Sequence, residues 1–275
     1  MAQGAVKEQN RPVTRPNSFI FTLFGDFVGG GRLWIGSLVR LMAEFGLSEQ
    51  AVRQAVSRMS RQGWLVASKQ GNRAFYGLTP AGMQRVEAIS PRIYEPAAEW
   101  DGRWRLLTYS IPERNREHRD RLRKDLTLLG LAPLSASTWI SPRDVMPAIR
   151  NILNGEELRD HVDFFIADYA GPRSDRELLE KSWDLPAIAA AYREFIDMYE
   201  PRLREEREQA ALTDEESFVE RLWLVQDFRR FVYLDPGLPG ALLPPHWPGS
   251  VASALFREYY ATISKKSTHF YQAAL

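Results

Sequence analysis

The stretch SEQAVRQAVSRMSRQ, residues 48–62, carries the pattern that decides the amino-terminal fold. At 100° per residue, one side of a helix over this stretch is apolar, and the other is polar and basic with no acidic residue expected on it. The hydroxyl of Ser48 can cap the amino end, and Gly63 suits a left-handed residue after the carboxyl end. Arginine, glutamine and serine side chains on such a helix can read base edges in a major groove. The apolar side consists of Val52, Ala55, Val56 and Met59.

The segments around residues 48–62 extend this pattern to a winged helix. Helices are expected over 18–28 and 32–46, and two short strands flank the Gly71-Asn72 turn. Residues 48–62 alone also fit an ordinary solvated amphipathic helix, but helix, short turn, helix and basic hairpin in this order favour DNA binding. The residues predicted to contact DNA are Gln50, Arg53, Gln54, Ser57, Arg58 and Arg61 of the helix and Lys69 and Arg73 of the hairpin.

Composition and charge describe a globular chain whose two parts differ. The 275 residues are 44% hydrophobic and include 8 Trp, 14 Phe and 10 Tyr, which excludes a disordered chain. Residues 1–92 hold 12 Lys and Arg against 5 Asp and Glu, net +7, whereas the remainder is net −6, giving the total of +1. A basic amino-terminal part attracts a polyanion such as DNA.

The rest of the chain predicts two further domains. Strand and helix patterns alternate as β-α-β-α-β from about residue 103 to 169, which indicates a ferredoxin-like α+β domain. Helical patterns dominate after residue 175, interrupted by the proline-rich stretch 235–250, which we interpret as an ordered loop before a last helix over 253–264. The predicted division is a flexible tail (1–17), a winged helix (18–92), a ferredoxin-like domain (93–172) and a mainly helical domain (173–275), together an α+β multidomain protein.

Enzyme chemistry finds little support in the sequence. The four histidines are scattered without ligand spacing, and neither a phosphate-binding loop nor a serine or cysteine nucleophile motif occurs. The chain has no cysteine, and we expect no signal peptide and no membrane span. The sequence therefore predicts a cytoplasmic protein that is not an enzyme and needs no metal or cofactor.

Six stretches spread along nearly the whole chain are distinctive when taken together. They are LFGDFVGGGRLWIGSL (23–38), VRQAVSRMSRQGWL (52–65), GNRAFYGLTPAG (71–82), WDGRW (100–104), KSWDL (181–185) and DPGLPGALLPPHWPG (235–249). Together they resemble the PaaX family of repressors of phenylacetic-acid degradation operons, and their order and the long proline-rich segment make this resemblance specific.

This resemblance implies a homodimer that binds a palindromic operator through the winged helix and is released by an aryl-acetyl-CoA thioester such as phenylacetyl-CoA. A CoA ester requires cations for its phosphates and an apolar pocket for its acyl group. Residues that supply both kinds of chemistry, each of which also fits an ordinary core or surface role, are Trp104, Arg105, Trp139, Trp183, Arg229, Arg230, His246 and Trp247.

The middle domain is also similar to Cas2-type nucleases, which have a ferredoxin-like fold with an Asp at the end of the first strand. Here Ser110 occupies that position, and a metal-dependent nuclease without this carboxylate lacks a ligand. We therefore interpret the domain as a scaffold that serves dimerisation. The sequence leaves two alternatives to a repressor, a metal-dependent nuclease built on this domain and a winged-helix scaffold that binds protein instead of DNA.

Overall fold

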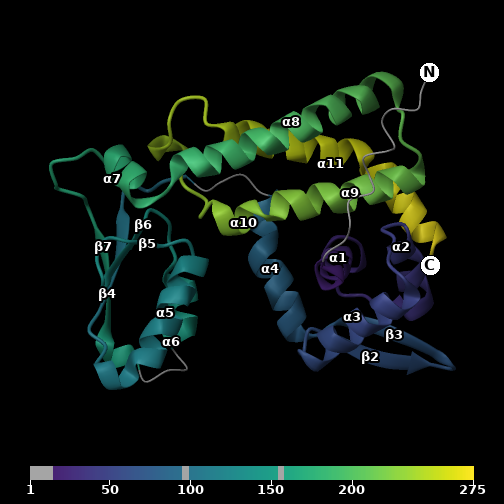
Figure 1. Cartoon of the computed structure of the whole chain (residues 1–275), viewed down its shortest axis with the longest axis horizontal. Coiled ribbons are helices and arrows are strands. Elements are labelled where there is room, and N and C mark those ends of the chain that lie inside the picture. The colour runs from purple at the N-terminus through teal and green to yellow at the C-terminus, as the bar shows by residue number, and fades with distance from the viewer. Residues whose placement is uncertain (1–14, 95–98, 154–157) are drawn as a thin grey trace. The chain divides into compact units, whose positions relative to one another are not determined.

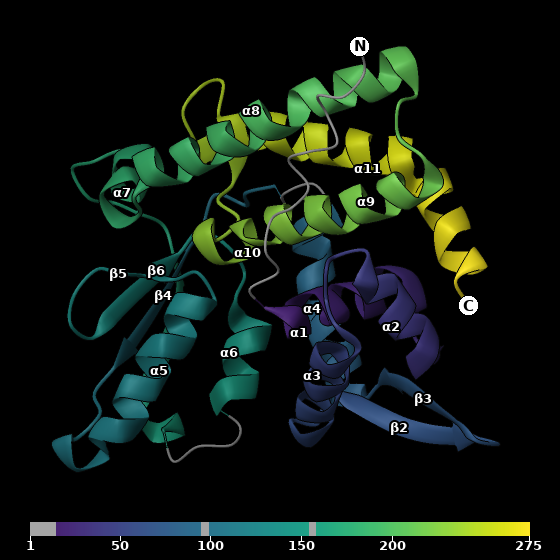
Figure 2. The same cartoon turned by 45° about the vertical axis from the view of Figure 1, so that its right-hand side comes forward.

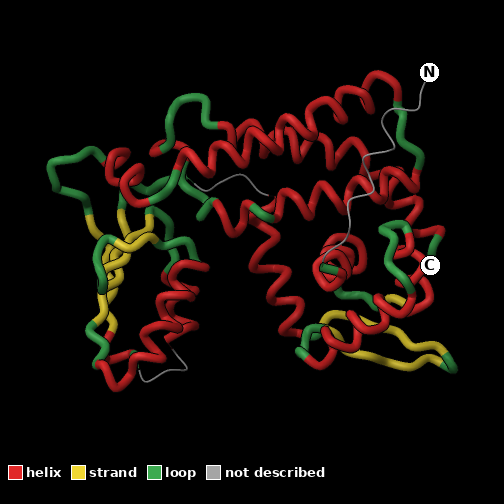
Figure 3. Tube along the Cα trace, viewed as in Figure 1, coloured by secondary structure: helices red, strands yellow, loops and turns green. Residues whose placement is uncertain are grey.

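The computed structural model describes residues 15–94, 99–153 and 158–275, which Figures 1 and 3 show as ribbon and tube. The predicted tail, residues 1–17, lies almost entirely outside the described residues. By contact the chain forms two compact units, the first from residues up to 94 with 199–228 and 255–275, the second from the described residues of 95–198 and 229–254. Among the described residues, no helix combines the length and apolar character needed to cross a membrane.

The amino-terminal elements form a winged helix, as predicted. In chain order they are α1 (Pro16–Leu23), the π-helical turn η2 (Phe24–Val28), β1 (Leu33–Trp34), α2 (Ile35–Ala43), α3 (Glu49–Arg61), β2 (Leu65–Gln70), β3 (Arg73–Leu78) and α4 (Pro80–Tyr94). The sheet order is β1-β3-β2, and its β2–β3 hairpin is drawn in yellow at the lower right of Figure 3.

The helix predicted over 32–46 is wrong at its amino end. Leu33 and Trp34 form β1 and pair antiparallel with Tyr76 and Phe75, and the helix begins only at Ile35. Pairing with β3 satisfies backbone groups that a first helical turn would leave open, and it buries Leu33. Periodicity alone cannot detect so short a strand, because its partner lies about forty residues downstream.

The central elements build an antiparallel four-stranded sheet. They are β4 (Trp104–Tyr109), η3 (Glu113–Asn115), α5 (Arg116–Leu128), β5 (Ala132–Pro133), β6 (Thr138–Ser141), α6 (Met146–Leu153), η4 (Arg159–His161) and β7 (Val162–Ala167). The sheet order β5-β6-β4-β7 is that of a ferredoxin-like fold, and α5 and α6 lie on one face of the sheet (Figure 2). Where the predicted β-α-β-α-β order has a single second strand, the structure has two short strands, β5 and β6, which pair with each other, and this supplies the fourth strand.

The carboxy-terminal elements are helical, as predicted. They are α7 (Asp175–Ser182), α8 (Leu185–Gln209), α9 (Asp214–Arg229), α10 (Phe231–Leu234), η5 (Gly240–Leu242) and α11 (Pro248–Ala273). The last helix is longer than the predicted 253–264 at both ends, and it starts with proline at its first position, where the missing N–H costs no helical bond. The proline-rich loop before it is ordered by Asp235, whose carboxylate accepts from the backbone N–H of Gly237 and the hydroxyl of Tyr192.

The winged helix and part of the carboxy-terminal helices share one hydrophobic core in the first unit. Phe218, Val219 and Leu222 of α9 are buried in the same cluster as the apolar side of α3 and the residues of α1 and α2. Phe19 of α1 packs edge-on against Trp223 of α9, with ring centroids 4.6 Å apart. The winged helix is thus part of a larger packed body.

A buried polar cluster joins the same elements. Asp26 of η2 and Arg221 of α9 form an ion pair of 2.8 Å, and their side chains are 3% and 7% exposed. The hydroxyls of Tyr94 and Tyr260 both donate to the carboxylate of Asp26, and burial raises the pKa of each tyrosine, so both remain neutral donors. Arg221 also donates to Ser267 of α11. The winged helix is therefore tied to α9 and α11 by charge as well as by packing.

A second polar contact in this unit predicts a pH effect on stability. Burial raises the pKa of Glu44, after α2, above its ordinary 4.5, and the neighbouring carboxyl of Glu215 in α9 raises it further. A raised folded-state pKa contributes stability that is fully present below pH 4.5 and lost as pH rises through the raised value. We therefore expect Glu44→Gln to raise the melting temperature at pH 7, with the difference shrinking to nothing at about pH 4.

Thermal unfolding of the Glu44→Gln variant and the parent protein between pH 4 and pH 8 measures this effect. Glu87→Gln, which removes an exposed carboxylate from α4, is the matched control and should follow the parent at every pH. Parallel curves for Glu44→Gln and the parent across the whole range would contradict the carboxyl pair.

Candidate nucleic-acid interface

Helix α3 is held with one side in the core and the other in solvent. The Ser48 hydroxyl accepts from the backbone N–H of Ala51 at 3.2 Å, which confirms the predicted cap. Gly63 adopts φ 76°, and Trp64 N–H donates to the Met59 carbonyl at 2.9 Å, which closes the carboxyl end. The side chains of the apolar face are buried, as predicted. Both ends and one face are therefore fixed, and the remaining face is presented rigidly.

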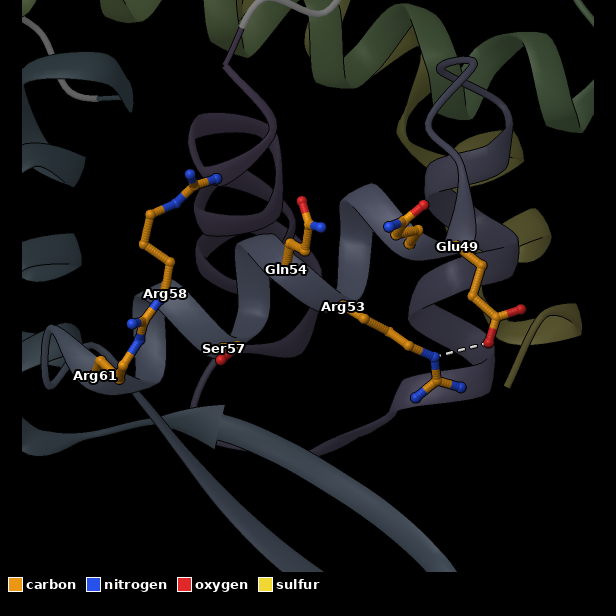
Figure 4. Close-up of a pocket in the computed structure, with 7 residues that line it drawn as sticks. Glu49, Arg53, Gln54, Ser57, Arg58 and Arg61 are labelled. Carbon is orange, nitrogen blue, oxygen red and sulfur yellow. Dashed lines mark hydrogen bonds and ion pairs between the residues drawn. The ribbon is translucent and has the colours of Figure 1, made fainter.

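The six predicted residues of the outward face lie together. All are exposed, and with Glu49 they line one open hollow of about 760 Å³ along the helix (Figure 4). The residues of this outward surface of α3 are Glu49, Gln50, Arg53, Gln54, Ser57, Arg58 and Arg61. A row of guanidinium, amide and hydroxyl groups on an exposed helix has the donor and acceptor pattern for base edges and phosphates.

The expectation of an outward face without acid is wrong. Glu49 lies on this face, and its Oε1 accepts from Nε of Arg53 at 2.7 Å. Both side chains are more than half exposed. A spacing of four residues brings Glu49 and Arg53 to the same side of the helix, and this signal was available in the sequence.

A second arginine of this face is held by a neighbouring helix. Nη2 of Arg58 donates to Oδ1 of Asn17 at 3.0 Å, and Asn17 lies in the first turn of α1. The sequence offered no signal for this contact, because the two residues are 41 positions apart. The bond limits the orientations of Arg58 before any ligand arrives.

The hairpin presents the two predicted basic residues near its tip. Lys69 and Arg73 are exposed on β2 and β3, where Lys69 pairs with Ala74 and Arg73 with Gln70. The guanidinium of Arg73 lies 4.6 Å from the ring centroid of Trp34, so β1 supports it by a cation–π contact. The structure thus places both cations on the wing of the fold, and their contact with DNA stays a prediction.

The predicted effector residues of the central sheet occupy separate environments. Trp104 is buried and donates from Nε1 to Asp175 at 2.6 Å, while Arg105, the next residue of β4, points to the opposite face. Arg105 donates twice to Asp101 at 2.7 Å, and these bonds lower the pKa of Asp101 to about 2. Trp139 is buried in the helix-facing core, where its Nε1 has no hydrogen-bond partner among the described residues.

Two of the eight predicted effector residues line a hollow. His246 and Trp247 lie in the proline-rich loop and, with Arg193 of α8, border a hollow of about 510 Å³ in the second unit. The His246 backbone has φ 59°, a left-handed conformation that is strained for a residue other than glycine. The residues that line this hollow are Glu180, Leu185, Pro186, Ala189, Arg193, Pro244, Pro245, His246, Trp247 and Pro248.

The remaining three predicted effector residues lie outside this lining. Trp183 follows α7 and is half-buried, as is Arg229 at the end of α9. Arg230 donates to the carbonyl of Ala191 at 2.7 Å and approaches Glu194 at 3.5 Å. Composition suggested the chemistry of these residues but could not place them. Within the described ranges no group of three or more His, Asp or Glu side chains is arranged to hold a metal ion.

Comparisons with known proteins agree over nearly the whole chain. Three family models match, "PaaX-like protein" over residues 15–82, "PaaX protein central Cas2-like domain" over 97–179 and "PaaX-like protein C-terminal domain" over 183–273. The Transcriptional repressor PaaX of Escherichia coli (strain K12) is 32% identical over 262 residues, covering 92% of this chain and 82% of that protein. An uncharacterized protein from Mycobacterium tuberculosis shares the fold, with a TM-score of 0.58, 22% identity and coverage of 94% of this chain and 99% of its own.

Proposed function

The chain belongs to the PaaX-like family of transcriptional repressors, and from this premise we propose that it represses an aromatic, phenylacetate-type catabolic operon by binding its operator through α3 and the β2–β3 hairpin. The family confirms the predicted fold class, a winged helix followed by a Cas2-like α+β domain and a helical domain. PaaX-like repressors are regulators and not enzymes, so the nuclease alternative is not retained.

The observation that carries the proposal is the outward surface of α3. Six exposed polar or basic side chains lie on a helix whose other face is buried and whose ends are capped. A homodimer would place two such helices in successive major grooves about 34 Å apart, which matches a palindromic operator. Salt dependence distinguishes this function from the alternative, a winged-helix scaffold that binds protein, because a phosphate-dominated interface loses affinity steeply as the salt concentration rises. Such a repressor works at the chromosome, in the cytoplasm.

The proposed effector is an aryl-acetyl-CoA such as phenylacetyl-CoA. Support comes from the hollow at His246 and Trp247, whose volume of about 510 Å³ lies within the range of about 300–1,000 Å³ for small-molecule sites. Its proline and tryptophan walls suit an aromatic acyl group, and Arg193 supplies a cation. Of the eight residues predicted for the effector, His246 and Trp247 are therefore the ones we propose for this hollow. The effector would release the repressor by favouring a dimer geometry that does not fit both operator half-sites. It can weaken operator binding only by the difference between its affinities for the two geometries, typically about 1–3 kcal/mol.

Gel-shift titration tests both parts of the proposal. The DNA is the region upstream of the protein's own gene and of neighbouring genes, at several salt concentrations, with and without a panel of acyl-CoA thioesters. We expect salt-sensitive, sequence-specific binding that an aryl-acetyl-CoA weakens and acetyl-CoA does not. Absence of specific binding to every segment would contradict the operator, and binding that no thioester changes would contradict the effector alone.

Substitution in the hollow tests where the effector binds. Arg193→Gln removes the cation of the hollow and is expected to raise the concentration of thioester needed for release about tenfold, within the range of a lost charged contact, with DNA affinity in its absence unchanged. Arg150→Gln, which removes an exposed arginine from α6 in the same unit, is the matched control. Equal thioester sensitivity of both variants and the parent would exclude this hollow as the site.

A further inference from the structure

Glu49 is an unexpected group on the outward surface of α3. Its side chain is 61% exposed and lines the same hollow as the six polar and basic residues of α3. A carboxylate on a surface that meets phosphates is repelled by them, so it weakens binding to every DNA sequence. Glu49 is advantageous on this surface if it increases the preference of the protein for the correct DNA sequence over other sequences.

The contact with Arg53 indicates how Glu49 can increase this preference. Glu49 Oε1 accepts from Nε of Arg53, and Figure 4 shows the two side chains meeting at the amino-terminal end of the helix. This bond occupies Nε and leaves the two terminal nitrogens of the guanidinium out of it. Those two nitrogens are the pair that can donate side by side to O6 and N7 of one guanine.

Folding stability does not account for the pair. An ion pair between two exposed side chains four residues apart on a helix adds little to stability, because water screens the charges and both side chains lose rotamer freedom. The favourable interaction of Glu49 with the helix amino terminus is likewise small at an exposed position. An effect of Glu49 is therefore expected in DNA recognition.

We propose that Glu49 is a specificity-determining residue of the interface, which positions the Arg53 guanidinium for one guanine of the operator half-site and lowers affinity for all other DNA. This inference rests on the proposed function, sequence-specific operator binding. It adds that the half-site contains a guanine opposite Arg53 and that the preference for it depends on a residue that need not touch the base. Glu49 acts here through Arg53 and is a positioning residue.

The test compares dissociation constants on three kinds of DNA. Fluorescence anisotropy gives the affinity of each protein for the operator, for its single-base variants and for a scrambled duplex. The base preference that Arg53→Ala abolishes identifies the position that Arg53 reads. For Glu49→Ala we expect preference at that same position to fall about tenfold, while affinity for scrambled DNA rises several-fold, since a repelling charge is gone.

Two further variants separate positioning from charge and from folding. Glu49→Gln keeps an oxygen acceptor for Arg53 and should retain much of the base preference while still binding scrambled DNA more tightly. Glu87→Ala removes an exposed carboxylate from α4 and should leave the base preference intact. If Glu49 had only a structural role, its replacement would lower the melting temperature without reducing the base preference at any one operator position.

The outcomes distinguish this inference from the proposed function. A parent protein that binds operator and scrambled DNA equally would contradict the proposed function, and the inference with it. A parent protein that discriminates, together with a Glu49→Ala variant whose base preferences are unchanged or uniformly reduced, would overturn the role of Glu49 alone.

Discussion

Replacing Arg221 by methionine is expected to lower the free energy of unfolding by about 3–5 kcal/mol, because the carboxylate of Asp26 then stays buried without its cationic partner. The two side chains are almost fully buried, so water does not screen their interaction or replace the lost partner. Arg221 also lies over the rings of Phe27 and Tyr260, at 4.2 and 4.5 Å from their centroids, and these contacts are lost as well. Urea denaturation followed by tryptophan fluorescence measures the change.

A double-mutant cycle shows whether the loss comes from the unpaired charge. Asp26→Asn keeps the shape of the side chain and removes the charge, so combining it with Arg221→Met removes the buried ion pair entirely. The double variant is expected to be more stable than the sum of the single losses predicts. Additive losses, or a loss below about 1 kcal/mol for Arg221→Met, would contradict the ion pair as an interaction that joins the winged helix to α9.

The helix over residues 48–62 could be predicted because its determinants are local. Ser48, Gly63 and the spacing of Val52, Val56 and Met59 act within a few residues of one another, and the structure places the helix at Glu49–Arg61. The hairpin followed from the Gly71-Asn72 turn for the same reason. A structure predicted from local signals is also the one observed when no contact with a distant segment competes with it.

The attachment of the winged helix to the carboxy-terminal helices could not be predicted. Asp26 and Arg221 are 195 residues apart, and nothing in either segment identifies the other. Likewise, Glu206 lies in a charge run that suggests a solvated helix end, yet its side chain is 4% exposed and pairs with Lys266 of α11 at 2.8 Å. Tertiary packing decides which charges are buried, and pairing of that kind is invisible to a pattern read along one segment.

The positions of the predicted effector residues could not be predicted from the sequence either. Eight aromatic and cationic residues supply suitable chemistry, but the pleat of β4 alone sends Trp104 and Arg105 to opposite faces. Arg193, which lines the hollow with His246 and Trp247, was not predicted because a single arginine on a helical pattern has no distinguishing signal. Residue type restricts what a site can bind, and the fold decides which residues share it.

The double variant Arg53→Ala/Arg58→Ala is expected to weaken operator binding at least about 30-fold. Each arginine that reads a guanine contributes about 1–3 kcal/mol, and a factor of ten corresponds to about 1.4 kcal/mol. The two side chains have different hydrogen-bond partners, Glu49 for Arg53 and Asn17 for Arg58, so the losses should nearly add. Both side chains are exposed, and folding stability should stay within about 0.5 kcal/mol of the parent. Anisotropy titrations on operator and scrambled duplexes at several salt concentrations measure the effect.

Comparison of the two duplexes assigns the role of the arginines. A loss on the operator that exceeds the loss on scrambled DNA identifies base contacts, whereas equal losses with a salt slope reduced by about one per arginine identify phosphate contacts. Arg204→Ala/Arg257→Ala removes the same charge from exposed positions of α8 and α11 in the same unit, and it should leave the difference between the duplexes unchanged. Undiminished operator affinity in the Arg53/Arg58 variant would contradict α3 as the recognition helix. Two of the three arginines on its outward face would then contribute nothing to DNA binding, and Arg61 would be the one that is left.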